Sequence, residues 1–481
     1  MSNKYSAITD WLKGKSKENI AITIGDLEKE CSITFPQTFS WSNNCKNAKN
    51  WLVQDYVVYE ATNILIFEYN SSLAKAILSG TNFKKTESSV AYALFKVGEK
   101  DEFYKQMNFY PRYFESAVEH FYNAPLKSER TKNGKTIFPE TRYNSWVNCY
   151  NYFSNNIKGK TTLTSKEIDD ACVQLGFYMA SWGMYRGSSF LLQNDYTIYR
   201  DILAKLLDPQ YDILWNLDTY IDRLPNVALP LPTITKFVDD FSNKLTSLIG
   251  DIRDILAPYK DYYVRKTWYT NHSNSATIPE VSKTLVTKLI LGTIGCYPAI
   301  DRYFGDAVGS VANDLEIDQI KCMLALAYCV KKDMVSSKIS FKLANDGGNV
   351  ALPLSDYPVM KLIDMYYFTF GMEKPFLKLI NELVTGKKTI TSISKDDKKL
   401  LKQFIINNSG SPKVDIAFPC SLLSKSTPAT GPCIHLDICE IAKAPPSNKC
   451  ELDYENIIDK LADKNLYEEL SKMKDDEDPE S

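Results

Sequence analysis

The chain has 481 residues, of which 44% are hydrophobic and 24% charged, with 20 glycines and 21 prolines. This composition excludes a disordered, a collagen-like or a membrane-embedded protein, and the length predicts about three domains or one large body with a small appendage. The net charge of −2 excludes nucleic-acid binding through bulk charge alone, so any such binding must be confined to patches. The three histidines, His120, His272 and His435, lie in no catalytic or zinc-protease spacing, which disfavours histidine-based hydrolysis.

The first residues contain no apolar stretch and no small-residue cleavage site, so we expect no secretory signal and a cytoplasmic location. No apolar run is long enough to span a bilayer, so we expect no contact with a membrane. The 11 cysteines are scattered along the chain, which predicts reduced thiols rather than disulfides. Five of them lie among apolar residues and are expected in the core: Cys149, Cys172, Cys296, Cys322 and Cys329.

Residues 1–70 are predicted to form a small α/β domain. The β-branched and aromatic runs at 56–59 and 64–69 indicate a hairpin, with Asn63 expected at the position of positive φ. Before it the pattern predicts a helix at 4–12, a strand at 21–24, a helix start at 25–30 and a helix at 45–53. This order of elements is that of a winged helix-turn-helix.

Four short stretches of this domain, at residues 4–5, 22–24, 41–44 and 48–52, resemble a small uncharacterised bacterial module. The resemblance implies an association with restriction and other defence proteins. A winged helix usually lays its last helix in a groove of nucleic acid, which would direct Asn44, Lys46 and Lys49 toward the ligand. However, residues 1–70 hold seven lysines and eight acidic residues, so docking to a protein partner is the alternative.

From residue 71 to 410 the apolar spacing is mostly helical, which predicts one large helical domain. Thr164 and Glu167 form a capping-box pattern that opens a helix expected to run to about Leu192. Further on, the pattern predicts a buried helix at 285–300 and two separate helices at 358–370 and 375–385.

This helical body resembles a group of uncharacterised bacterial proteins over residues 110–370. The shared stretches are residues 142–146, 180–190, 287–303 and 357–364. The resemblance implies one contiguous domain and carries no known activity.

Residues 287–303 also resemble the helix-hairpin-helix DNA glycosylases, in which an apolar helix is followed by a proline and an aspartate that faces the target nucleotide. The resemblance implies that Asp301 supports cleavage of a glycosidic bond and that Lys288 attacks the sugar as an amine nucleophile. The glycine-rich hairpin is reduced here to Gly292 and Gly295, and Lys288 precedes Asp301 by fewer residues than in those enzymes. Capping of a helix or pairing with Arg302 is the structural alternative for Asp301.

Two basic stretches are interleaved with aromatic residues. Between Lys127 and Lys160 the chain carries seven basic and two acidic residues, and residues 259–269 repeat the pattern. Basic groups beside flat rings are typical of single-strand binding, so we expect phosphate contacts there, with a solvated loop and core aromatic residues as the alternative. The candidate contacts are Arg130, Lys132, Lys135, Arg142, Arg265 and Lys266.

Residues 411–450 are rich in proline, serine and cysteine and lack a helical pattern. Cys420, Cys433, Cys439 and Cys450 could hold zinc or an iron–sulfur cluster, although no close cysteine pair is present, and free thiols in a loop are the alternative. Residues 451–481 hold twelve acidic and four basic residues and are expected to form an acidic helix and a disordered tail.

The leading prediction is therefore a mainly α protein with an α/β winged-helix-like N-terminal domain, a large helical domain and a cysteine-rich irregular segment. We expect it to bind DNA or RNA in a bacterial defence setting. A glycosylase-like nucleic-acid-processing enzyme and a protein-interaction scaffold are the two alternatives.

Overall fold

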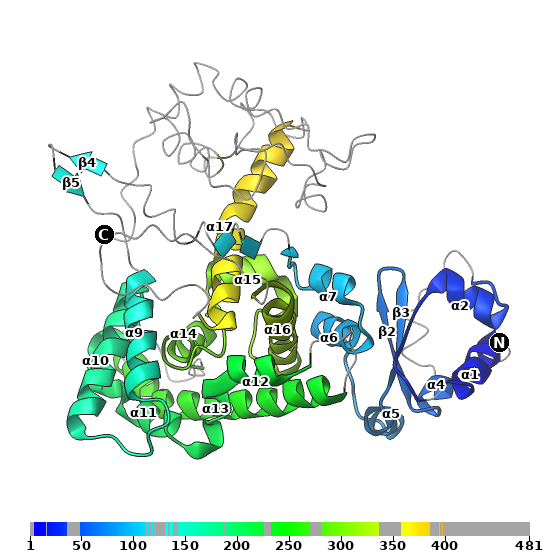
Figure 1. The fold of residues 1–481 in the computed structure, drawn as a ribbon, viewed down its shortest axis with the longest axis horizontal. Helices are drawn as coiled ribbons and strands as arrows, with labels where there is room; N and C mark the ends of the chain where they lie inside the picture. The colour runs from blue at the N-terminus through cyan, green and yellow to red at the C-terminus, as the bar shows by residue number, and fades with distance from the viewer. Residues whose placement is uncertain are drawn as a thin grey trace.

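The computed structural model describes residues 4–15, 17–35, 49–111, 114–115, 117–118, 121, 130–132, 135–137, 143–186, 189–225, 232–268, 280–335, 357–384, 394 and 397. The chain is mainly helical, as predicted, and contains a three-stranded antiparallel sheet and a two-stranded hairpin (Figure 1). No helix in these ranges is long and apolar enough to cross a membrane.

The N-terminal segment folds around the three-stranded sheet. Its elements are α1 (Lys4–Lys13), β1 (Ile20–Thr23), α2 (Ile24–Cys31), α4 (Lys49–Leu52), β2 (Tyr56–Ala61) and β3 (Ile64–Tyr69), and the strand order is β1-β3-β2. The hairpin of β2 and β3 is as predicted, but the positive φ falls on Thr62 (46°) and not on Asn63. Thr23 is the N-cap of α2, because its hydroxyl oxygen accepts the backbone N–H of Asp26 at 3.1 Å.

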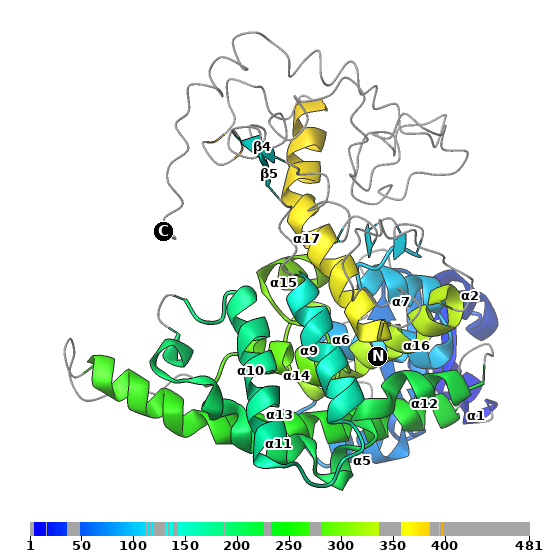
Figure 2. The same ribbon diagram turned by 60° about the vertical axis from the view of Figure 1, so that its left-hand side comes forward.

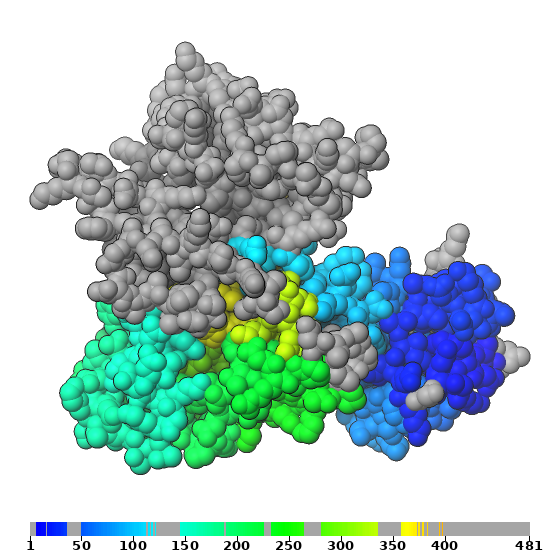
Figure 3. All heavy atoms as spheres, viewed as in Figure 1, coloured from blue at the N-terminus to red at the C-terminus, as the bar shows by residue number. Residues whose placement is uncertain are grey.

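Both faces of this sheet are buried. On one face, Leu65 and Phe67 pack with Trp51 and with the apolar sides of α1 and α2. On the other face, Tyr59 and Ile66 belong to the core of the helical body, where α5 (Ser71–Leu78), α6 (Glu87–Val97) and α7 (Lys100–Gln106) follow. The N-terminal segment therefore docks on the body through α6 and occupies one end of the molecule (Figures 1 and 3).

The body is built from helices with clear sequence signals. Thr164 and Glu167 form the expected capping box at the start of α10. The helices are α9 (Tyr143–Asn156), α10 (Ser165–Ser181), α11 (Arg200–Leu206), α12 (Leu217–Arg223), α13 (Pro232–Trp268), α14 (Lys283–Thr293), α15 (Arg302–Val308), α16 (Ile317–Val330) and α17 (Val359–Val384). Short 3-10 turns lie at Phe190–Gln193, Tyr196–Tyr199, Pro209–Tyr211, Leu214–Asn216 and Gly309–Val311, and a π-helical turn lies at Lys331–Val335.

Four of the predicted helices have different bounds. The helix after Thr164 ends at Ser181 rather than near Leu192, because Gly183 adopts a φ of 73° and the chain turns there. The helix expected over 285–300 stops at Thr293, before Gly295 with a φ of 73°. The two helices expected at 358–370 and 375–385 are one, because packing of α17 against α15 outweighs the single backbone hydrogen bond lost at Pro375.

The centre of the body is formed by α14 and α16, which are buried almost all round. The long helix α13 runs along one side of them, and α17 rises out of the body in both ribbon views (Figures 1 and 2). Tyr366 and Tyr367 anchor α17 by donating hydrogen bonds to the backbone carbonyls of Asn108 and Met107.

Candidate functional site

The predicted pair Lys288 and Asp301 lies in the centre of the body. The Lys288 ammonium, on α14, donates a hydrogen bond to the backbone carbonyl of Trp182 at 2.9 Å and lies 5.9 Å from the centre of that indole ring. Asp301 caps α15, since its carboxylate accepts the backbone N–H of Phe304 at 3.0 Å. The capping role was the structural alternative for Asp301.

The electrostatic environment of Asp301 is set by its neighbours. Burial raises the pKa of Asp301 above its ordinary value, and the Phe304 N–H acts against this shift. The carboxylate of Asp364 raises the same pKa further, whereas the ammonium groups of Lys288 and Lys361 lower it. The structure thus brings Lys288 and Asp301 into one polar cluster, in which each side chain is already hydrogen-bonded to a backbone group.

A second pair in this cluster was not predicted. Lys361 and Asp364, one turn apart on α17, form an ion pair of 2.7 Å with side-chain exposures of only 2% and 10%. The other carboxylate oxygen of Asp364 accepts the backbone N–H of Ala299 at 3.0 Å. Charges so deeply buried need such partners, and two charged residues in the apolar run 357–364 were the signal that could have revealed the pair.

Three aromatic rings surround the Lys361 ammonium. It lies 5.0 Å from the ring centres of Phe121 and Trp146, and 5.4 Å from that of Trp182. Aromatic faces attract cations, so these rings complete the solvation of the buried charge. Residues 142–146, 180–190, 287–303 and 357–364 all extend to this cluster, through Trp146, Trp182, α14 with Asp301, and α17.

Trp146 connects the cluster to a nearby cavity. Its ring stacks on those of Tyr150 at 5.0 Å and Tyr357 at 5.3 Å, and its indole N–H donates to the backbone carbonyl of Leu291 at 3.0 Å. Tyr150 and Tyr357 also line the cavity. Both tyrosines are therefore fixed by the same side chain that faces Lys361.

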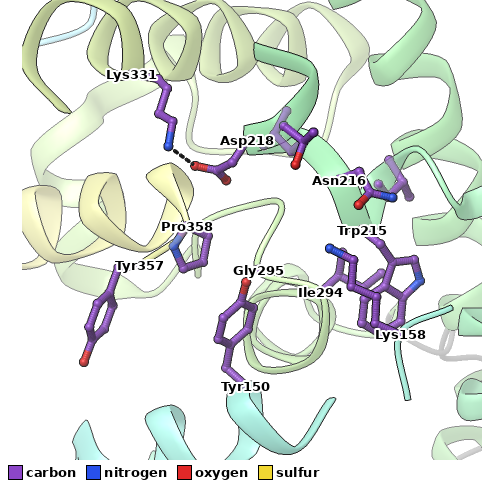
Figure 4. A pocket seen from close by; sticks show the side chains of 13 residues that line it. Tyr150, Lys158, Trp215, Asn216, Asp218, Ile294, Gly295, Lys331, Tyr357 and Pro358 are labelled. Atoms are coloured by element: carbon purple, nitrogen blue, oxygen red, sulfur yellow. Dashed lines mark ion pairs between the residues drawn. The ribbon is translucent and has the colours of Figure 1, made fainter. Parts of the chain in front are cut away.

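The cavity has a volume of about 150 Å³. Asp218 and Lys331 form an ion pair of 3.1 Å in its wall, and Asp218 also accepts the backbone N–H of Val359 at 3.1 Å (Figure 4). Burial raises the pKa of Asp218, and Lys331 acts against this shift. The lining residues are Tyr150, Lys158, Leu214, Trp215, Asn216, Leu217, Asp218, Thr219, Ile294, Gly295, Lys331, Tyr357 and Pro358.

Lys158 differs from the other charged residues of the cavity. Its side chain is exposed and lies away from the Lys331–Asp218 pair (Figure 4). Among the described residues its ammonium has no carboxylate within ion-pair distance. Partial burial lowers the pKa of Lys158, and Asp218 only partly offsets this.

The predicted nucleic-acid contacts are placed in part. Arg130, Lys132 and Lys135 lie on a hairpin of β4 (Arg130–Lys132) and β5 (Lys135–Ile137), in which Lys132 pairs with Lys135 and Arg130 with Ile137. The backbone places Lys49 in α4, and Arg265 and Lys266 near the end of α13. The side chains of these three residues and of the three basic residues of the hairpin are outside the described part, as are the whole residues Asn44, Lys46 and Arg142.

Fewer aromatic residues of the first basic stretch can stack on bases than expected. Trp146 and Phe153 are fully buried, so they cannot stack on bases, while Tyr150 and Tyr152 are half-buried. Helical periodicity explains the difference, because residues 146 and 153 both lie on the inner face of α9.

The proposed metal ligands Cys420, Cys433, Cys439 and Cys450 lie outside the described residues. Within the described ranges, no group of three or more histidine, cysteine or acidic side chains is placed to hold a metal ion. The five cysteines expected in the core are free thiols and buried, as predicted. Burial raises the pKa of Cys172 to about 11, which keeps this thiol protonated at neutral pH.

No protein-family model, curated protein or solved structure matches this chain.

Proposed function

We propose that this protein binds single-stranded nucleic acid and that the β4–β5 hairpin is its main contact. The observation that carries the proposal is the register of the hairpin. Residues directly opposite each other in an antiparallel pair lie on the same face, and so do residues two apart on one strand. Positions 130, 132 and 135 therefore share one face, and all three are basic.

A narrow ribbon with cationic positions on one face suits contact with a phosphate backbone. Both ribbon views place the hairpin outside the packed helices (Figures 1 and 2). The proposal needs no bulk positive charge, in agreement with the net charge of −2 of the whole chain.

Helix α9 extends the contact surface beyond the hairpin. It contains no acidic residue, and its exposed residues Asn148, Asn155 and Asn156 offer amides that can bind phosphate or base edges. At about 1.5 Å per residue the helix spans roughly 21 Å, which is enough for several nucleotides. It leads to Lys158 and Lys160, the last basic residues of the stretch.

We further propose that the N-terminal segment is a winged helix that docks to a protein. The sheet order β1-β3-β2 with helices before and between the strands supports this fold. Its helix α2 carries Asp26, Glu28 and Glu30 against the single Lys29, which disfavours a phosphate contact by this helix. An association with defence proteins stays a prediction.

The test is fluorescence anisotropy of the full chain with a short labelled single-stranded oligonucleotide at several salt concentrations. We expect the triple variant Arg130→Ala, Lys132→Ala, Lys135→Ala to bind more weakly. We also expect its slope of log affinity against log salt to be shallower by about 2, because each phosphate contact with a single strand contributes about 0.7.

The matched control changes the opposite face of the same hairpin. Thr131 and Thr136 pair with each other, so the double variant Thr131→Ala, Thr136→Ala keeps the ribbon and its charges. It should bind as the unaltered protein does. Equal affinity and slope in all three proteins would show that the hairpin is not the contact. Tighter binding of a duplex than of a single strand would show that the ligand is double-stranded nucleic acid.

A further inference from the structure

The cavity beside α9 contains one lysine that belongs to no ion pair of the described residues. The charged residues that line it are Lys158, Lys331 and Asp218. The Lys331 ammonium pairs with Asp218 at 3.1 Å and also with Asp222 at 3.8 Å. This leaves Lys158 as the cation without a counter-charge among the described residues.

The charge of Lys158 carries a desolvation cost, although its side chain is exposed. Partial burial disfavours the charged form, and Asp218, the carboxylate that acts against this shift, is already paired with Lys331. An anion bound in the cavity would offset this cost and gain a charge-assisted hydrogen bond.

The size and the walls of the cavity restrict the size and chemistry of the uncharged part of such an anion. A cavity of about 150 Å³ is large enough to bind a benzene ring. The surface that lines the cavity is mostly polar, and Tyr150, Trp215, Ile294 and Pro358 contribute its flat or apolar parts. One amide N–H of Asn216 donates to the carbonyl of Asp212, so the second N–H remains to donate to an anion.

The cavity is also held in shape before any ligand enters. Tyr150 is fixed by its stack on Trp146, and Trp146 by its hydrogen bond to Leu291. Gly295 has a φ of 73°, and a Cβ at this position would lie 2.7 Å from the Tyr150 ring and 2.8 Å from that of Pro358. Preorganised walls reduce the entropy lost on binding.

From these observations we propose that the cavity binds a small organic anion, with a ring-sized body between Tyr150, Trp215 and Pro358 and its oxyanion on the Lys158 ammonium. The site does not include the hairpin and does not depend on nucleic-acid binding, although Lys158 also ends the α9 part of the proposed nucleic-acid surface. The oxyanion can be a carboxylate or a phosphate, and the two have the same geometry of recognition by a single lysine.

The test is isothermal titration of the full chain with benzoate, phenyl phosphate and the neutral analogue benzamide. We expect at least one of the two anions to bind about tenfold or more tightly than benzamide, because the amide lacks the charge. The tighter of the two anions identifies the class of oxyanion. Absence of binding by both anions, or equal binding of benzamide, would overturn the proposal.

Variants of Lys158 locate the site. Lys158→Gln should weaken anion binding about tenfold or more, whereas Lys160→Gln should have no effect, since Lys160 pairs with Glu167 and does not line the cavity. Lys158→Glu should lose the anion and bind the cation benzamidinium instead. Unchanged anion binding by both Lys158 variants would refute the assignment, and thermal unfolding without ligand checks that each variant is folded.

Discussion

The charged residues of the Trp146 cluster and those of the cavity differ in how completely they are paired. In the cluster, Lys361 and Asp364 form a buried ion pair among aromatic rings, and Lys288 donates to a backbone carbonyl. In the cavity, Lys331 and Asp218 are also paired, but Lys158 belongs to no ion pair of the described residues. The comparison teaches that removing one partner of a buried pair should be costly, and that an unpaired charge beside a cavity is a candidate contact for a ligand.

The largest effect on stability is expected from breaking the buried ion pair of Lys361 and Asp364. Asp364→Ala removes the partner of Lys361 and of the Ala299 N–H, and should lower the free energy of unfolding by about 3–5 kcal/mol, because a buried charge is left uncompensated. Urea unfolding followed by fluorescence measures the change. The matched control is Asp10→Ala, which breaks an exposed pair of the same spacing with Lys13. Equal unfolding midpoints for the two variants would show that burial of the pair does not matter.

A smaller effect is expected at the wall of the cavity. Gly295→Ala should cost about 2–4 kcal/mol, from the positive φ and from contact with Tyr150 and Pro358, and should weaken anion binding. Gly159→Ala is the control, since Gly159 has a φ of 77° but no atom within 4 Å of the added Cβ. It should cost only about 1 kcal/mol. Thermal and urea unfolding compare the two variants. Equal losses of stability would show that Tyr150 and Pro358 move aside for the added Cβ without a cost.

The smallest effect is expected at Asp301. Because the pKa of Asp301 is raised above its ordinary value of 3.8, its ionisation opposes folding, and this cost grows as the pH rises from 3.8 through the raised pKa. Asp301→Asn removes the cost and keeps the cap, so the variant should be as stable as the original protein or slightly more stable at pH 7. Its stability should also depend less on pH above 3.8. Unfolding curves over this pH range measure both, and a clear loss of stability at pH 7 would contradict this account of Asp301.

Local signals predicted much of the fold. The capping box of Thr164 and Glu167 and the hairpin of residues 56–69 depend on residues a few positions apart, and both were found as predicted. The end of the helix at Ser181 and the continuity of α17 through Pro375 were predicted wrongly. Each depends on backbone conformation or on packing that no short window of sequence contains.

The candidate site was less accessible to prediction. The partners of Lys361 come from positions 121, 146, 182 and 364, and only the last is close in the sequence. The lack of an ion pair at Lys158 among the described residues becomes visible only once Lys331 and Asp218, which are distant in the sequence, are seen to pair. Spacing in the sequence indicated the basic stretch around Arg130, but the shared face of positions 130, 132 and 135 follows from the strand register.

The most direct test of the proposed function is the salt dependence of binding to a single-stranded oligonucleotide. It compares the full chain with the triple variant Arg130→Ala, Lys132→Ala, Lys135→Ala and with the double variant Thr131→Ala, Thr136→Ala. We predict that only the triple variant loses about 2 from the slope of log affinity against log salt. An unchanged slope in the triple variant, or an equal loss in the double variant, would contradict a phosphate contact by the basic face of the hairpin.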